Sequence, residues 1–155
     1  MREVDVMGVR VEMPSSQPLV LLREVSGERY LPIWIGAVEA TAIAFAQQGV
    51  VPPRPLTHDL MKDVLEATGN ELTEVRITEV KDGVFFALLV LGSGAEVSAR
   101  PSDSIALALR TGSRIVCADE VLDEAGLAVP VEQEDEVERF REFLDHVTPE
   151  DFDPT

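Results

Sequence analysis

Two segments of the sequence place an arginine, a hydroxyl side chain and an aspartate at the start of an expected helix. In segment 99–112, Arg100 precedes a proline, and Ser102 and Asp103 follow that proline. Serine is a favoured N-cap residue, and an aspartate in the first turn is stabilised by the free N–H groups and the helix dipole. Gly112 is placed to end this helix in a left-handed conformation. The segment therefore predicts a helix mouth that carries three polar groups.

Segment 54–69 repeats this arrangement with slightly different spacing. Arg54 precedes a proline, Thr57 is the expected N-cap, and Asp59 falls in the first turn. His58 lies between the cap and the aspartate. If the two helix mouths lie on the same side of the fold, they form a polar pocket rich in arginine and aspartate.

Such a pocket has the chemistry to bind and cleave a phosphodiester. Helix N-termini and arginines bind phosphate, carboxylates bind Mg²⁺ or Mn²⁺, and an imidazole transfers protons. The candidate catalytic residues are His58, Asp59, Asp103 and Glu39. The candidate phosphate-binding residues are Arg54, Arg100, Ser102 and Thr57, and the candidate metal ligands are Asp59 and Asp103.

The same residues also have a purely structural interpretation. The hydroxyls then serve as helix caps, the aspartates complement helix dipoles, and the arginines pair with the aspartates or with carbonyls at strand ends. Glu39, the only charge on the expected helix 36–48, is then a surface residue near its helix N-terminus. Both interpretations remain open from the sequence.

The chain has 29 acidic and 13 basic side chains and a net charge of −16, which is unevenly distributed. Residues 1–131 have a net charge of −8, and the short segment 132–155 carries the other −8. An acidic chain gains nothing from the non-specific attraction to phosphate on which generic nucleic-acid binding depends. Any role with nucleic acid must therefore use a local arginine cluster or a divalent cation.

Several common catalytic motifs are absent, including G-x-G-x-x-G, the Walker loop, C-x-x-C, H-E-x-x-H and the nucleophile elbow. His58 and His146 are the only histidines, so neither a histidine-rich metal site nor a Ser-His-Asp triad is expected. The single Cys117 lies among apolar residues and is expected to be a buried, inert thiol. Neither a membrane-spanning run nor a signal peptide is recognisable, so we expect a cytoplasmic protein that does not bind membranes.

The expected elements run in the order strands, two helices, strands, a helix, a short strand and a last helix. This order is not a regular alternation of strand and helix. It predicts a single α+β domain in which a largely antiparallel or mixed sheet packs with three main helices plus a C-terminal helix. The composition changes at Pro130, so we expect a domain over 1–130 and an acidic C-terminal helix and tail over 131–155.

Four features indicate how these elements pack. The apolar alternation of the first strand changes phase at Gly8, which predicts a β-bulge. Pro32 places the strand 30–35 at a sheet edge or at a bulge. The strand 84–91 is apolar throughout, which predicts a central strand covered on both faces. The many alanines of helix 36–48 predict close packing.

Three runs of residues carry a family likeness. They are Leu31-Pro-Ile-Trp-Ile-Gly-Ala-Val-Glu-Ala, Arg54-Pro-Leu-Thr-His-Asp-Leu-Met and Ala99-Arg-Pro-Ser-Asp-Ser-Ile-Ala-Leu-Ala. In this order and spacing they resemble the bifunctional nuclease (BFN) domain family, over about residues 1–130. The resemblance implies a compact α+β domain, self-association into a homo-oligomer, and the DNase and RNase activity reported for some plant members. It supplies no catalytic assignment, so the site residues named above rest on their chemistry alone.

Two hypotheses follow. In the first, the protein is a metal-assisted phosphodiesterase acting on DNA or RNA: Arg54 and Arg100 hold phosphate, Asp59 and Asp103 hold Mg²⁺ or Mn²⁺, and His58 transfers protons. In the second, it is a non-enzymatic module that binds a ligand or a protein. The Arg-Asp helix mouths are then structural, and the acidic tail engages a protein partner.

Overall fold

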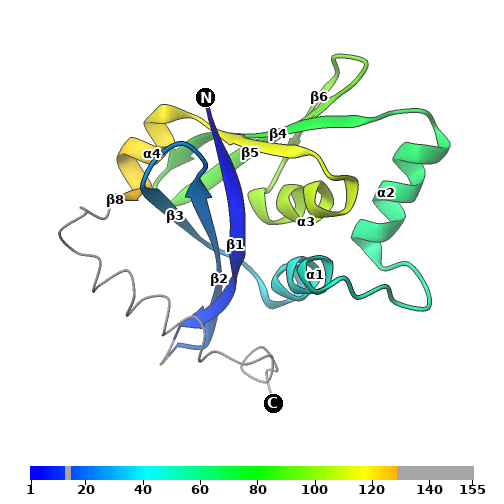
Figure 1. Cartoon of the computed structure of the whole chain (residues 1–155), viewed down its shortest axis with the longest axis horizontal. Helices are drawn as coiled ribbons and strands as arrows, with labels where there is room; N and C mark the ends of the chain where they lie inside the picture. The colour runs from blue at the N-terminus through cyan, green and yellow to red at the C-terminus, as the bar shows by residue number, and fades with distance from the viewer. Residues whose placement is uncertain (13–14, 129–155) are drawn as a thin grey trace.

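The computed structural model describes residues 1–12 and 15–128, which form eight strands and four helices around a shared hydrophobic core (Figure 1). The strands are β1 (Arg2–Glu12), β2 (Gln17–Glu24), β3 (Arg29–Trp34), β4 (Leu72–Lys81), β5 (Val84–Leu91), β6 (Glu96–Ala99), β7 (Arg114–Cys117) and β8 (Leu127–Ala128). The helices are α1 (Ala37–Gln48), α2 (Thr57–Ala67), α3 (Pro101–Thr111) and α4 (Asp119–Ala125). None of these helices has the length and apolar character that crossing a membrane would require. The expected C-terminal helix and tail lie outside the described residues.

All strands belong to one mixed sheet in the order β6-β5-β4-β7-β1-β2-β3-β8. Neighbouring strands are antiparallel except β4 and β7, which are parallel. The chain between these two strands crosses over through β5, β6 and α3, because parallel neighbours cannot be joined by a tight turn. The α+β fold with a mixed sheet is therefore confirmed.

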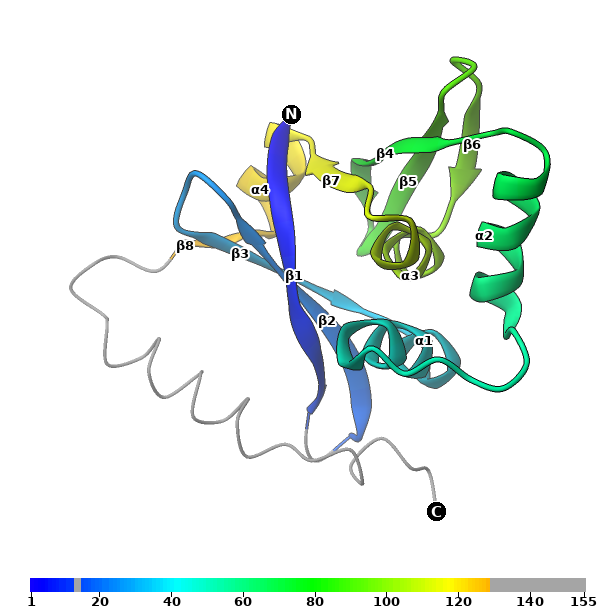
Figure 2. The same cartoon turned by 45° about the vertical axis from the view of Figure 1, so that its right-hand side comes forward.

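The sheet bends strongly, and α1 and α3 lie side by side within the bend (Figures 1 and 2). The buried face of α1 consists of Ala40, Ala42 and Ile43, and the buried turn of α3 runs through Ile105, Ala106, Leu107 and Ala108. The alanines among these residues let the two helices approach each other closely, as the alanines of the first helix predicted. The remaining long helix, α2, packs against α3 at the outer edge of the molecule (Figure 2).

Three local predictions are confirmed. The pairing of β1 with β2 shifts register between Val6 and Gly8, and Gly8 has a φ of +150°, which few other residues adopt. Gly112 ends α3 in the left-handed conformation. β3 pairs with β8 only at Arg29 and Tyr30, so at Pro32 that side of the strand is a sheet edge. The missing N–H of Pro32 therefore removes no hydrogen bond between the two strands.

The prediction of a central strand over 84–91 is wrong. This strand, β5, is second from the edge of the sheet, and only Ala87 and Leu89 are buried. One face packs against α3, while Val84 and Phe86 on the other face are 56% and 43% exposed. The continuous apolar run therefore does not indicate coverage on both faces, because two of its eight side chains are exposed and four more are only partly buried.

A nearly buried carboxylate, Glu74, links β4 to β7. It accepts hydrogen bonds from Arg76 Nε and, at 2.7 Å, from Arg114 Nε. Burial alone would raise the pKa of Glu74, but the hydrogen bonds from Arg76 and Arg114 outweigh it and hold that pKa below its usual value. The folded protein therefore binds fewer protons than the unfolded chain in mild acid, and Glu74 contributes stability that is lost as the pH falls through its folded pKa.

Replacing Glu74 by glutamine is expected to lower the free energy of unfolding at neutral pH by about 1.5–3 kcal/mol, the contribution of hydrogen bonds to charged groups. The variant should also lose less stability than the wild type below about pH 4, where an unperturbed glutamate titrates. Urea unfolding at several pH values measures both effects. Glu79→Gln, an exposed site on the same strand, is the matched control, and an equal loss in both variants would contradict the assignment.

Candidate functional site

The N-terminal turns of α1, α2 and α3 converge on one open cavity of about 1010 Å³, bounded on another side by β6. We call this cavity the α2 groove. Five of the predicted site residues line it, namely Glu39, Thr57, His58, Arg100 and Asp103. Most of the remaining wall is apolar and includes exposed Leu60 and Met61 of α2. The helix starts at Thr57 and at Arg100 thus open on the same groove, which is the condition for a shared polar pocket.

Four of these side chains form a chain of charged hydrogen bonds. His58 Nε2 lies 2.9 Å from Asp103 Oδ1, and Arg100 Nε donates to Asp103 Oδ2 at 2.9 Å. Arg100 Nη2 donates to Glu39 Oε1 at 2.6 Å. The hydrogen bonds to Asp103 and then Glu39 raise the pKa of Arg100, which keeps its guanidinium charged. The arrangement joins three helix starts that are far apart in the sequence.

The helices begin slightly earlier than predicted. The N-cap of α3 is Arg100 rather than Ser102, since Pro101 occupies the first helical position, where its missing N–H costs nothing. The N-cap of α2 is Leu56 rather than Thr57, and its N–H donates to Asp59 Oδ2 at 3.1 Å. Neither hydroxyl acts as an N-cap.

Asp59 pairs with an arginine that the sequence did not single out. Arg110 Nε donates to Asp59 Oδ1 at 2.7 Å, and the Arg110 side chain is only 8% exposed. Partial burial would raise the pKa of Asp59, but the hydrogen bonds from Arg110 and from the Leu56 N–H outweigh it and lower that pKa. The only signal for Arg110 in the sequence was a basic residue in the last turn of a helix, after the apolar run Ile105–Leu109.

The two aspartates predicted as joint metal ligands therefore lie in separate ion-pair groups. Asp103 lines the α2 groove, whereas Asp59 lines a second cavity behind it together with Arg110. Within residues 1–12 and 15–128, no group of three or more His, Cys, Asp or Glu side chains is arranged to hold a metal ion. Of the two predicted ligands, only Asp103 presents its carboxylate, a suitable donor for a hard cation, to the groove.

The other predicted residues are placed as follows. Thr57 is exposed at the mouth of the groove. Ser102 is 6% exposed and faces a different cleft, on the other side of Arg100. Arg54 is exposed. It lines neither the α2 groove nor the cavity that contains Asp59, so the structure does not bring it to the other site residues.

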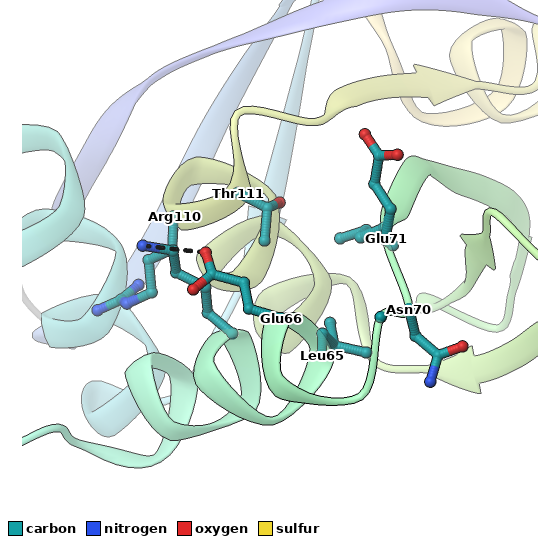
Figure 3. Close-up of a pocket in the computed structure, with 9 residues that line it drawn as sticks. Leu65, Glu66, Asn70, Glu71, Arg110 and Thr111 are labelled. Carbon is teal, nitrogen blue, oxygen red and sulfur yellow. Dashed lines mark ion pairs between the residues drawn. The ribbon is translucent and has the colours of Figure 1, made fainter.

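A further cavity, of about 430 Å³, lies where the C-terminal part of α2 meets the end of α3 (Figure 3). Figure 3 shows Leu65, Glu66 and Asn70 on one side of it and Arg110 and Thr111 on the other. None of the candidate site residues lines this cavity. This cavity therefore receives none of the chemistry predicted from the sequence.

Comparison with known proteins shows which family the chain belongs to. The model of the bifunctional nuclease domain matches residues 20–130, which include all three sequence runs noted above. The chain is also 55% identical to uncharacterized proteins of Mycobacterium tuberculosis, in strain CDC 1551 / Oshkosh and in strain ATCC 25618 / H37Rv. In both cases the match covers 100% of each chain. The chain is therefore a member of the bifunctional nuclease domain family.

Proposed function

We propose that the protein is a nuclease that hydrolyses phosphodiester bonds of DNA or RNA in the α2 groove. The observation that carries the proposal is the contact of 2.9 Å between His58 Nε2 and Asp103 Oδ1, beside the exposed guanidinium of Arg100. Phosphodiester hydrolysis needs a group that moves protons and a cation that stabilises the phosphate charge. Membership of the bifunctional nuclease domain family supports the same reaction class.

In this proposal His58 transfers protons and Asp103 orients its ring. Because Nε2 is engaged by Asp103, the substrate would exchange protons with Nδ1. No described residue hydrogen-bonds to Nδ1, and His58 lines the groove with a side chain that is 9% exposed. A carboxylate that fixes one ring nitrogen of a histidine and leaves the other available is a common arrangement in general acid–base catalysis.

Arg100 would bind the phosphate. Its side chain is 67% exposed, and Nε and Nη2 are held by Asp103 and Glu39, which leaves Nη1 without a partner among the described residues. The two carboxylates fix the direction of the guanidinium. Its Nη1 can therefore bind a phosphate without a further loss of side-chain freedom. Glu39 is then a positioning residue rather than a catalytic one.

A requirement for Mg²⁺ or Mn²⁺ is part of the proposal, with Asp103 as the protein ligand. Mg²⁺ in enzymes of phosphate chemistry is often held by one or two carboxylates together with substrate phosphates, so a complete protein cage is not needed. When bound, such a cation neutralises phosphate charge and activates water. Asp59, paired with Arg110 behind the groove, is left with a structural role.

Cleavage assays on the purified full-length chain test this proposal, with end-labelled single-stranded DNA and RNA as substrates. We expect cleavage in Mg²⁺ or Mn²⁺ and none in excess chelator, because an acidic protein with few arginines at the site depends on a cation to offset the phosphate charge. A mock purification from cells without the gene measures contaminating nuclease. Cleavage no faster than in the mock sample would contradict the proposal.

One observation favours a second candidate function, a binding module without catalysis. Leu60, Met61 and Val64 are between 38% and 53% exposed on one helix, α2, although residues of this type are usually covered. In this alternative the α2 surface binds a protein, either a second copy of the chain or another partner, and the ion pairs of the groove are structural. The cleavage assay above separates the two functions.

A further inference from the structure

A second cleft, of about 340 Å³, lies directly beside the α2 groove, and we call it the Trp34 cleft. Its walls are the end of β3 with Trp34, the turn from β4 into β5 with Val84 and Phe85, and the start of α3 with Arg100 and Ser102. This volume is at the lower end of the range typical of small-molecule sites. Among the described residues that line it, Arg100 is the only charged one, and Asp103 and Glu39 hold its guanidinium from the groove side.

Ser102 gives this cleft a polar group that the fold does not use. Its side chain is 6% exposed, and no described residue hydrogen-bonds to its hydroxyl. The residue lines the cleft. Ser102 lies in the first turn of α3, where the backbone N–H groups are free because they have no intrahelical acceptor. A buried, unpartnered hydroxyl at a helix N-terminus beside an arginine suits a phosphate oxygen.

Trp34 gives the cleft an aromatic face. It is 52% exposed at the end of β3, and Phe85 near the start of β5 lines the cleft as well. Exposed aromatic rings stack nucleobases, whereas the α2 groove is lined by no Phe, Tyr or Trp. A base therefore finds a stacking partner only on the Trp34 side of Arg100.

We propose that the Trp34 cleft binds one nucleotide of a single-stranded nucleic acid, with its base against Trp34 and its phosphate at Ser102 and Arg100. This inference rests on the proposed nuclease function and names its substrate class. Arg100 lines both cavities, so a phosphate held there connects a base in the Trp34 cleft to a strand that continues past His58. Single strands are required because a paired base in a duplex cannot expose its face for stacking.

Fluorescence measures this binding directly, since Trp34 is the only tryptophan in the chain. The full-length protein is titrated with a short single-stranded oligothymidylate twice, once in chelator, which suppresses cleavage, and once in Mg²⁺ with the fluorescence read before cleavage proceeds. We expect saturable quenching of Trp34. An oligonucleotide with the same phosphates but no bases should cause little quenching, and so should a duplex of the same length. No quenching by the single strand, or equal quenching by all three probes, would overturn the inference.

Variants separate the two halves of the site. Ser102→Ala retains Trp34 and is expected to weaken binding by about tenfold or more, as expected for a lost hydrogen bond to a charged group. Ser93→Ala, in the β5–β6 turn, is the matched control and should bind as the wild type does. Trp34→Leu, followed by the anisotropy of a labelled oligonucleotide, is expected to weaken binding by about 5- to 150-fold, the range for base–aromatic stacking. Unchanged affinity in both Ser102→Ala and Trp34→Leu would overturn the inference.

Failure of the Trp34 cleft inference can be distinguished from failure of the proposed nuclease function. A protein that cleaves nucleic acid without any change in Trp34 fluorescence retains the nuclease function and loses the Trp34 cleft as its base site. A protein that shows base-dependent quenching but no cleavage above the mock sample supports the cleft and contradicts the nuclease proposal.

Discussion

Cleavage of nucleic acid by the His58→Gln variant is expected to be about 10²–10⁴-fold slower than by the wild type, the usual contribution of a general acid–base group. Glutamine retains a polar side chain of similar size but cannot transfer protons at neutral pH. Asp103→Asn should lower the rate by orders of magnitude as well, because an amide holds the His58 ring less firmly and is a poor ligand for a hard cation. Initial rates at saturating Mg²⁺ or Mn²⁺ measure both losses.

The matched control for these variants is Asp63→Asn, an exposed aspartate on α2 that does not line the groove. All proteins are purified identically, and urea unfolding verifies that His58→Gln and Asp103→Asn remain folded at the assay temperature. Equal rates in the wild type, both site variants and the control would assign the activity to a contaminant and remove His58 and Asp103 from the mechanism.

Replacing Arg110 by alanine is expected to lower the free energy of unfolding by about 3–5 kcal/mol, the usual cost of removing one partner from a buried ion pair. Besides its contact with Asp59, Arg110 donates to the carbonyl of Ala106 at 2.8 Å and to that of Ala42 at 3.0 Å. One side chain thus ties α3 to both α1 and α2. Without it, a partly buried carboxylate and two helix carbonyls each lose a donor.

Urea unfolding followed by circular dichroism measures this loss. Lys62→Ala, which removes an exposed ion pair with Glu66 on α2, is the control and should cost less than about 0.5 kcal/mol. Adding Asp59→Asn to the Arg110→Ala variant should cost less than the two single changes together, because the pair acts as a unit. A loss below about 1 kcal/mol for Arg110→Ala would show that α2 is held by other contacts.

Much of the local structure could be predicted from the sequence. The bulge at Gly8, the end of α3 at Gly112 and the edge position of Pro32 follow from backbone geometry, which acts within a few residues. The order of strands and helices follows from apolar periodicity in the same way. Three short sequence runs were enough to indicate the bifunctional nuclease domain family, which the family model matches over residues 20–130.

The partners of the site residues could not be predicted in this way. In the structural interpretation the arginines pair with the aspartates or with carbonyls at strand ends, without a stated pairing. Arg100 pairs with Asp103 of its own segment, whereas Asp59 does not pair with Arg54. Asp59 instead meets Arg110, 51 positions away, and His58 meets Asp103, 45 positions away. Long-range partners depend on how helices dock, and local propensity carries no information about docking.

The sequence by itself determined the elements, their bounds to within one or two residues, and the chemical groups near the helix starts, because these depend on neighbours a few residues apart. Only the tertiary structure decided which helix starts meet. The crossover that makes β4 and β7 parallel carries α3 back between the sheet and α2, and so brings Asp103 to His58. The same packing leaves one face of β5 open and sets Trp34 opposite Ser102 across one cleft, although 68 positions separate them. The apolar periodicity of a strand or a helix cannot predict such a contact, because the contact depends on the order of strands in the sheet.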